Sequence, residues 1–512
     1  MCRRKTTGRQ ADFRNKHEDP LLFLPTGRRV PGKDLLQTST KADFEMNPTK
    51  ALPAEMSQWF KDHFYASRAL QYPYRSWLDM QSKAALARRQ PFEAAGRMLH
   101  MWRQLGTEGF GAERVVRLME VVRENCYRHG KLLPAAENRL RLEFVQSDKA
   151  REIRRLYGAF PLEDRLRLRY PNDNDPERQG DLIVLKPYDP ATGERGVLML
   201  MYSEAVLAMA AMYDLSALAS QYMFVLEPSS WGYQDARFLL YLGSDLDVLI
   251  QSPRYADFEF IERLQTNLVA VRVGAGEWVD PAVFQAREKD KPAGYDVVML
   301  AAWDPLKRHE VFFRAAARVK RERPLRFALI GYDMGWTREP IERLLRQYDL
   351  ETEATIYEDI PHAEVARIVA DSKASLLLSQ REGASRAIYE SMFCGTPIIV
   401  YRHQCGVNLD HVNKRTGLLA DDNELADAIK SVLDHPEAFD PRGWATENAG
   451  YSNATDKINE ALAEMASFRG CSWTRDIAAK KNAPNLRYAA AGVYEYFAAE
   501  YERLSEFLLP LD

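Results

Sequence analysis

The segment that decides the fold starts with an apolar run, Ala374-Ser-Leu-Leu-Leu378. It continues as Ser379-Gln-Arg-Glu-Gly-Ala-Ser-Arg386, Ala387-Ile-Tyr-Glu-Ser-Met-Phe-Cys394 and Gly395-Thr-Pro-Ile-Ile-Val-Tyr401. The first and last runs are typical of buried strands, and the interval between them reads as a turn followed by a helix. Two strands joined by a helix predict a parallel βαβ unit.

Apolar runs of strand length recur on both sides of this unit and alternate with helical stretches. We expect strands at 297–300, 327–330, 354–357, 374–378 and 398–401, and helices around 309–321, 338–348, 363–371, 386–394 and 423–434. Five repeats of this kind predict an α/β, doubly wound domain over residues 295–463.

A shorter series of the same kind precedes this domain. Strand-like runs occur at 181–185, 197–201, 223–226, 248–250 and 268–273, which predicts a second Rossmann-like domain with a parallel sheet over residues 181–291. The polar stretch 285–294 ends in Pro and Gly and has the composition of an interdomain linker.

The flanking segments have a different character. Residues 1–50 are mixed polar and basic without a sustained period, so we expect a flexible basic tail. Residues 51–175 show the helical period and are interpreted as a helical extension. Residues 464–512 form a C-terminal helical tail, which we expect to pack back through an apolar face made of Val493, Phe497, Leu504 and Leu508.

Charge is unevenly distributed along the 512 residues. Residues 1–180 hold 34 Lys and Arg against 23 Asp and Glu, and the remainder holds 36 against 50. The basic N-terminal part has two interpretations. It attracts an anionic partner such as a phospholipid surface, a lipid-linked diphosphate or an acidic glycan, or it is an ordinary solvated helical surface. Nothing in the sequence suggests a nucleic-acid partner.

The cysteines and the apolar runs bear on the compartment. The five cysteines lack C-x-x-C or zinc-like spacing, which favours reduced thiols. We find no uninterrupted run of about 18 apolar residues and no apolar stretch of a secretory signal near the start. We therefore expect a cytoplasmic location, with peripheral contact at the inner face of the membrane as an option.

The loop after the strand at 374–378 carries the strongest candidate chemistry. Ligands of an open parallel sheet collect at the carboxyl ends of the strands, where this loop lies. Gly383 permits close backbone approach and Ser385 is a natural N-cap, so free amides at 383–386 would face a diphosphate. Glu382 and Glu390 are spaced to hold two parts of one extended ligand.

These residues resemble those of a known family. The Glu-x7-Glu pattern from Glu382 to Glu390, followed by Cys394-Gly-Thr-Pro-Ile-Ile-Val400, is similar to the donor site of the family-4 retaining glycosyltransferases (glycosyl transferases group 1). Trp303-Asp-Pro-Leu-Lys-Arg-His309, Leu329-Ile-Gly331 and Thr416-Gly-Leu-Leu419 stand where that family has similar segments. The resemblance implies the GT-B fold, with two Rossmann-like domains and a helical N-terminal extension.

The resemblance also implies roles for individual residues. Glu390 would bind the ribose of a nucleotide-diphosphate sugar and Glu382 the hydroxyls of the donor sugar. Lys307 would neutralise the leaving diphosphate. The amides of Gly383, Ala384 and Ser385 would complete the phosphate site, with Gly331 at the end of a neighbouring strand. No metal or other cofactor is implied, because lysine and backbone dipoles replace a cation.

The sequence departs from the family pattern in two places. Many relatives carry Gly-Arg where this chain has Ala301 and Ala302, so one phosphate-binding cation is missing. Arg308 or Arg386 is a candidate replacement, although each is also interpretable as a solvated helix residue. Many relatives also have a histidine after the strand at 223–226, where this chain has Glu227. Glu227 is a candidate for acceptor or donor-sugar contact, or a loop residue paired with an arginine.

The sequence therefore predicts a retaining glycosyltransferase that acts on an unknown acceptor. A sugar-nucleotide epimerase of the same fold and a non-catalytic sugar-nucleotide-binding protein are the alternatives. The product separates them: a transferred sugar, an epimerised nucleotide sugar, or bound ligand without turnover.

Overall fold

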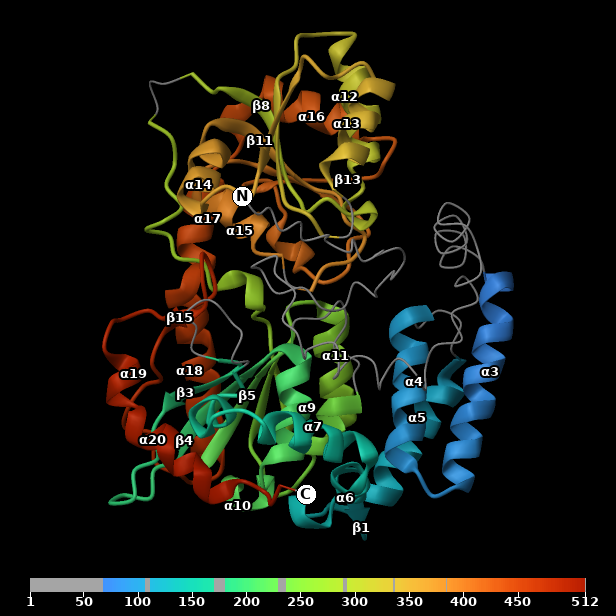
Figure 1. Cartoon of the computed structure of the whole chain (residues 1–512), viewed down its shortest axis with the longest axis vertical. Coiled ribbons are helices and arrows are strands. Elements are labelled where there is room, and N and C mark those ends of the chain that lie inside the picture. Colours follow the sequence, from blue (N-terminus) through green and yellow to red (C-terminus); the bar gives the residue numbers. More distant parts are fainter. Residues whose placement is uncertain are drawn as a thin grey trace, which may run out of the picture.

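The computed structural model describes residues 68–105, 111–169, 180–228, 236–288, 292–334, 337–383 and 385–511. It contains two sheet domains, one above the other in Figure 1, with helices at one side and a C-terminal tail that returns to the lower domain. The predicted basic tail, residues 1–50, lies outside the described residues.

The upper sheet has six strands, all paired in parallel. In spatial order they are β10 (Ala354–Glu358), β9 (Phe327–Gly331), β8 (Tyr295–Leu300), β11 (Ser372–Leu377), β12 (Ile398–Tyr401) and β13 (Gly417–Ala420). The chain order reverses between β8 and β11, and the carboxyl ends of strands at such a reversal form a crevice for ligands. The doubly wound domain predicted from the sequence is confirmed, with β13 as an additional edge strand.

Helices cover both faces of this sheet. One core joins the sheet to α12 (His309–Lys320), α13 (Arg338–Gln347) and α16 (Leu425–Asp434). The other joins it to α14 (His362–Ala370), α15 (Ala387–Phe393) and α17 (Pro441–Asn448). Along β8, Val297 and Met299 enter the first core and Val298 enters the second, as the period of two in a strand requires.

The lower sheet has five strands in sequence order: β3 (Leu182–Lys186), β4 (Gly196–Met201), β5 (Tyr222–Glu227), β6 (Val248–Gln251) and β7 (Leu268–Val271). The strands β4 to β7 are parallel, as predicted, but β3 runs antiparallel to β4. The expectation of an entirely parallel sheet was wrong because β3 and β4 are joined by a short connection, which can only reverse the chain. Three α-helices of the described residues lie between these strands in the sequence: α9 (Tyr202–Met212), α10 (Leu215–Ala219) and α11 (Tyr255–Leu264).

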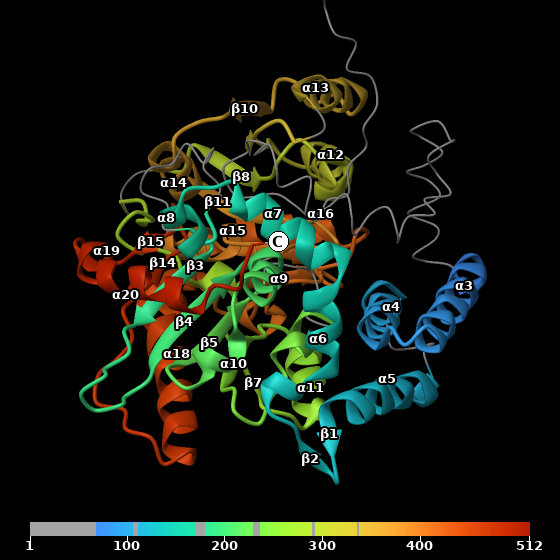
Figure 2. The same ribbon diagram turned by 60° about the horizontal axis from the view of Figure 1, so that its bottom comes forward.

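The N-terminal extension is helical in its described part. It comprises α3 (Arg68–Ala87), α4 (Pro91–Leu105), α5 (Gly111–Cys126), the hairpin β1 (Tyr127–Arg128) and β2 (Lys131–Leu132), α6 (Arg139–Gln146), α7 (Asp148–Gly158) and α8 (Leu162–Leu166). Residues of α4 to α8 share one core with the lower sheet, whereas α3 packs on α4 through a small cluster around Leu78 and Met101. Figure 2 shows α3, α4 and α5 standing at the side of the lower domain.

The C-terminal segment crosses from the upper domain to the lower one. The long helix α18 (Gly450–Phe468) contributes Ile458, Leu462 and Ala466 to the core of the lower sheet. After it come β14 (Lys480–Lys481), β15 (Arg487–Tyr488), α19 (Val493–Tyr496) and α20 (Ala498–Arg503). The Tyr501 hydroxyl accepts from the amide of Val184 in β3 at 3.1 Å. The tail packs on the lower domain as two short helices and a 3-10 turn.

Candidate active site

Lys307 and Glu382 meet at the strand reversal. Lys307 ends a short 3-10 turn, Pro305–Lys307, which follows β8 and is capped by the Asp304 carboxylate. Its Nζ donates to Oε1 of Glu382 at 2.7 Å, and the Ser379 hydroxyl donates to the same oxygen at 2.5 Å. Burial opposes the charge on Lys307, but the Glu382 carboxylate outweighs it, so the pKa of Lys307 is raised. The lysine is therefore a fixed cation at this edge of the sheet.

A second loop holds the Glu382 backbone in place. The amide of Glu382 donates to the carbonyl of Cys405 at 2.8 Å, and the amide of Cys405 donates to the carbonyl of Gln380 at 2.8 Å. Gly406 has φ +118°, and a Cβ there would lie 1.9 Å from the carbonyl oxygen of Glu382. Only glycine fits this approach, so the sequence of the second loop fixes the position of Glu382.

The helix after this loop places Glu390 inside the site. Glu390 is 7% exposed, and burial raises the pKa of its carboxyl, with the Arg386 charge opposing the shift. No described residue donates a hydrogen bond to its carboxylate. A carboxylate that is buried but free of protein donors is suited to accept from ligand hydroxyls.

The start of α15 differs from the expectation. The helix begins at Ala387, its N-cap position is Arg386, and no side chain caps it. The prediction of Ser385 as N-cap was therefore wrong. The amides of Gly383 and Ser385 donate no hydrogen bond to another described residue, which is compatible with a phosphate contact. Ala384 lies outside the described residues.

The two candidate replacement arginines have different surroundings. Arg308 donates to the carbonyl of Leu378 at 2.9 Å, pairs with Asp422 and stacks over Tyr401 at 4.4 Å. These contacts connect Arg308 to the residue that follows β11, to Asp422 and to Tyr401 at the end of β12, so its side chain holds these segments together. Arg386 instead donates through Nη1 to backbone carbonyls of the C-terminal tail, at residues 482 and 484. A phosphate contact stays a prediction for both.

Gly331 is explained by packing. A Cβ at this position would lie 2.6 Å from the ring of Trp303 and from the carbonyl oxygen of Ala301. Trp303 is fully buried and donates from Nε1 to Glu358 Oε1 at 2.6 Å. The predicted contact of Gly331 with a donor remains a prediction, because the indole already covers this strand end.

Glu227 lies at the carboxyl end of β5 and is 2% exposed. Lys480 Nζ donates to its Oε2 at 2.7 Å, and the Asn482 side-chain amide donates to its Oε1 at 3.1 Å. Burial lowers the pKa of Lys480 to about 8, although Glu227 favours the charged form. Both oxygens of Glu227 are satisfied within the protein, and its partner is a lysine where the sequence suggested an arginine. The structure thus gives Glu227 a role in joining the tail to the lower domain.

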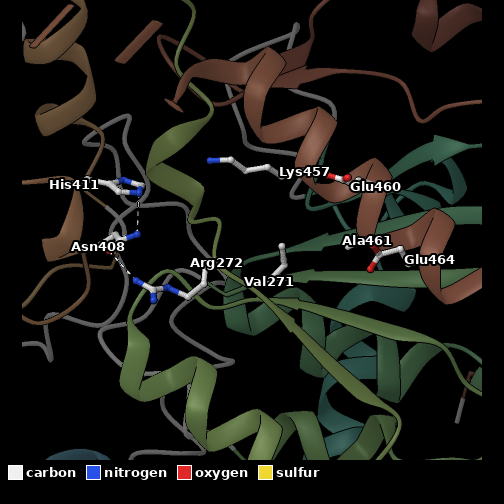
Figure 3. Close-up of a pocket in the computed structure, with 8 residues that line it drawn as sticks. All are labelled: Val271, Arg272, Asn408, His411, Lys457, Glu460, Ala461 and Glu464. Atoms are coloured by element: carbon white, nitrogen blue, oxygen red, sulfur yellow. Dashed lines mark hydrogen bonds between the residues drawn. The ribbon is translucent and has the colours of Figure 1, made fainter. Parts of the chain in front are cut away.

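An open groove of about 420 Å³ lies between the domains (Figure 3). Its wall combines the end of β7, the loop after β12 and the helix α18: Val271, Arg272, Asn408, His411, Lys457, Glu460, Ala461 and Glu464. His411 contacts the hydroxyl of Tyr389 in α15 at 2.7 Å and the Asn408 amide at 2.9 Å, and Arg272 donates to Asn408 at 2.9 Å. This chain of contacts joins α15 to the lower sheet.

Three residues near the site were not identified from the sequence. Tyr332, which directly follows β9, lies within electrostatic reach of Lys307, Glu382 and Arg386. Its position directly after a strand was the only feature of the sequence that could have identified Tyr332 as a site residue. Lys480 and Asn482 lie in the C-terminal tail, and no local pattern connects them to the upper domain.

Metal sites and membrane spans were sought in the described residues. No group of three or more His, Cys, Asp or Glu side chains there is arranged to hold a metal ion. No helix within the described ranges is long and apolar enough to cross a membrane.

Residues 282–448 match the family model described as Glycosyl transferases group 1. This match covers the whole linker and all six strands of the upper sheet, and it confirms there the resemblance to the glycosyl transferases group 1. No curated protein matches the chain.

Solved structures with a similar arrangement cover about half of the chain. Sucrose-phosphate synthase from Thermosynechococcus elongatus is 17% identical with a TM-score of 0.41, over 54% of this chain and 74% of that one. HepE of Anabaena in complex with UDP-glucose is 15% identical with a TM-score of 0.42, over 52% and 78%. The lipopolysaccharide outer core galactosyltransferase WaaB is 17% identical with a TM-score of 0.38, over 51% and 72%.

Proposed function

We propose that this chain is a glycosyltransferase that moves a sugar from a nucleotide-diphosphate donor to an acceptor with retention of anomeric configuration. The observation that carries the proposal is the meeting of Lys307 with Glu382 in the loops at the carboxyl ends of β8 and β11, with the buried carboxylate of Glu390 on the helix that follows the second loop. Strand reversals of doubly wound sheets are where nucleotides bind, and the family match covers these residues.

The proposed roles follow from the surroundings of each group. Glu390 accepts from the ribose hydroxyls, and Glu382, held by Ser379 and Lys307, accepts from the donor sugar. Lys307 faces the diphosphate together with the backbone amides of Gly383, Ala384 and Ser385. A cation and dipoles fixed before the reaction stabilise the charge that develops on the leaving group.

The proposed reaction breaks the bond between the anomeric carbon and the diphosphate oxygen, and the electron pair stays on that oxygen. Lys307 offsets the new negative charge. The acceptor hydroxyl adds to the same face of the sugar, and its proton passes to the departing diphosphate. The stereochemical outcome is retention.

Partners and location are part of the same proposal. UDP is the first nucleotide to test, because HepE was solved in complex with UDP-glucose. The predicted cytoplasmic location and a contact of the basic N-terminal helices with anionic membranes stay proposals. Co-sedimentation with anionic and neutral vesicles tests the contact, and equal binding to both would refute it.

The decisive experiment incubates the purified chain with UDP-, GDP- and ADP-sugars and a mixture of acceptors. We expect release of the nucleotide and a new glycoside, whose first-formed anomer, read by proton NMR, keeps the donor configuration. An epimerised nucleotide sugar, or binding without any product, would replace the proposal with one of the two alternatives. An inverted product would refute retention.

A further inference from the structure

The C-terminal hairpin β14–β15 lies between the two domains, where Figure 1 shows β15 at the left of the junction. Its tip is attached to the segment that follows β7. The amide of Asn482 donates to the carbonyl of Trp278 at 2.7 Å, and Ala483 pairs with Val279 as an isolated parallel bridge. Trp278 belongs to the core of the lower domain, whereas Val279 and Ala483 belong to the second core of the upper domain. The hairpin tip is therefore fixed at the junction of the two domains.

Asn482 is 8% exposed, and every hydrogen-bonding group of its side-chain amide has a partner in this junction. Its amide nitrogen donates to Glu227 Oε1 at 3.1 Å and to the carbonyl of Ala275 at 2.8 Å, and its oxygen accepts from Lys480 Nζ at 2.7 Å. Both amide hydrogens and the oxygen have partners, so the side chain has one orientation and the backbone at this position is held with it.

The backbone of the same residue reaches the upper domain. The carbonyl of Asn482 accepts from Arg386 Nη1 at 2.6 Å, and the carbonyl of Pro484 accepts from the same atom at 3.1 Å. The Nε and Nη2 atoms of Arg386 make no hydrogen bond to another described residue. These two atoms form the edge of a guanidinium that can bind a phosphate with two parallel hydrogen bonds.

Arg386 lies within electrostatic reach of two groups at the candidate site. Burial raises the pKa of Glu390 and of Tyr332, which follows β9, and the charge of Arg386 opposes both shifts. Arg308, by contrast, is held by Leu378, Asp422 and Tyr401. Of the two arginines, Arg386 is thus the one with a free edge beside Glu390.

We propose that Asn482 is a positioning residue, which holds one edge of Arg386 so that the other edge binds the diphosphate of the donor. This inference rests on the proposed function, because it assigns a role at the same site. It adds a binding cation, Arg386, and a residue from the C-terminal tail that acts only through that cation.

Binding of UDP and of inorganic pyrophosphate, measured by calorimetry, tests the inference in four variants. They are Arg386→Gln, Asn482→Ala, the double variant, and Lys481→Ala as the matched control. Lys481 lies in the same hairpin but pairs with Asp280 and does not contact Arg386. Thermal melting checks the fold, and Asn482→Ser, which keeps one polar contact, replaces Asn482→Ala if that variant does not fold.

We expect Arg386→Gln to weaken both ligands about ten- to hundredfold, since a charged hydrogen-bond donor is lost. Asn482→Ala should weaken them less, Lys481→Ala should not change them, and the double variant should bind like Arg386→Gln alone, because Asn482 acts through Arg386. Wild-type affinity in Arg386→Gln, or additive losses in the double variant, would overturn the inference while leaving the proposed function intact. If the wild-type chain bound neither these ligands nor GDP or ADP, the proposed function itself would fail and the inference with it.

Discussion

Replacing Lys307 with Met tests the central assignment most directly. The methionine keeps an unbranched chain that is one atom shorter and removes the ammonium, which lies 2.7 Å from Glu382 Oε1. Because charge on the leaving diphosphate builds only as the bond breaks, the loss should fall on turnover, whereas donor KM should change by no more than a few-fold.

The structure sets the expected size of the effect. Fixed donors of this kind supply about 2.7–4 kcal/mol to the transition state, so kcat should fall about 10²- to 10³-fold. The cost to folding is smaller than for a fully buried pair, because the side chains of Lys307 and Glu382 are 21% and 13% exposed. Exposed pairs contribute up to about 1 kcal/mol, and removing one partner of a fully buried pair costs about 3–5. We therefore expect a destabilised but folded variant.

The assay compares initial rates and single-turnover rates with those of Lys373→Met. Lys373 pairs with Asp296 at 2.8 Å, but it lies at the amino end of β11, away from the candidate site. This control loses an ion pair of the same sheet without losing a cation at the carboxyl edge. Normal kcat in Lys307→Met, or an equal loss in Lys373→Met, would refute the assignment of Lys307 to the leaving group.

Three further predictions concern donor binding, acid stability and metal dependence. Glu390→Gln should weaken binding of UDP about tenfold, since the amide nitrogen cannot accept from a ribose hydroxyl; unchanged affinity in calorimetry would place the ribose elsewhere. His309 is buried, and no residue in the described ranges forms a hydrogen bond with either ring nitrogen. Burial lowers its pKa to about 3, with the Lys307 charge adding to the shift. The unfolded chain already binds this proton near pH 6.5, so the free energy of unfolding should fall as the pH drops from about 6.5 to 3. This histidine should account for a loss of about 2 kcal/mol at pH 5. In denaturant titrations the free energy of unfolding of His309→Phe should fall less steeply with pH, and a pH profile identical to that of the wild type would contradict the prediction. Because Lys307 supplies a cation at the proposed diphosphate position, EDTA should leave sugar transfer intact; loss of activity that manganese restores would contradict this.

The sequence was sufficient for most of the upper domain. Its strands are short apolar runs and its helices carry the 3.6-residue period, so both signals are local. Lys307 and Glu382 were named separately through the family resemblance, and topology explains why they meet, because both lie in loops that follow strands flanking the reversal. The motif spacing did not show the start of α15, since Ser385 fits an N-cap by residue type but the helix begins at Ala387.

The lower domain shows the limit of local signals. An apolar run indicates a strand but not its direction, so the residues of β3 alone do not show its antiparallel pairing; the signal was the short connection to β4, which leaves no room for a crossover helix. The partner of Glu227 lies 253 residues further along the chain, at Lys480. No pattern in either segment specifies that contact, which depends on how the tail returns across the domain junction.

The first turn of α15 connects the candidate site to the lower domain through two sets of contacts. At its start, Arg386 is bonded to the hairpin tip that also holds Glu227. Further along, Tyr389 reaches Arg272 through His411 and Asn408. Just before the helix the backbones of the two domains approach closely, since a Cβ on Gly276 would lie 2.5 Å from the carbonyl oxygen of Ser385. A shift of this helix relative to the lower sheet must break or rearrange these bonds, and a ligand that binds Arg386 and Glu390 acts on the same helix. We therefore expect substitutions at the junction to change donor affinity without touching the donor, and calorimetry with junction variants measures that coupling free energy.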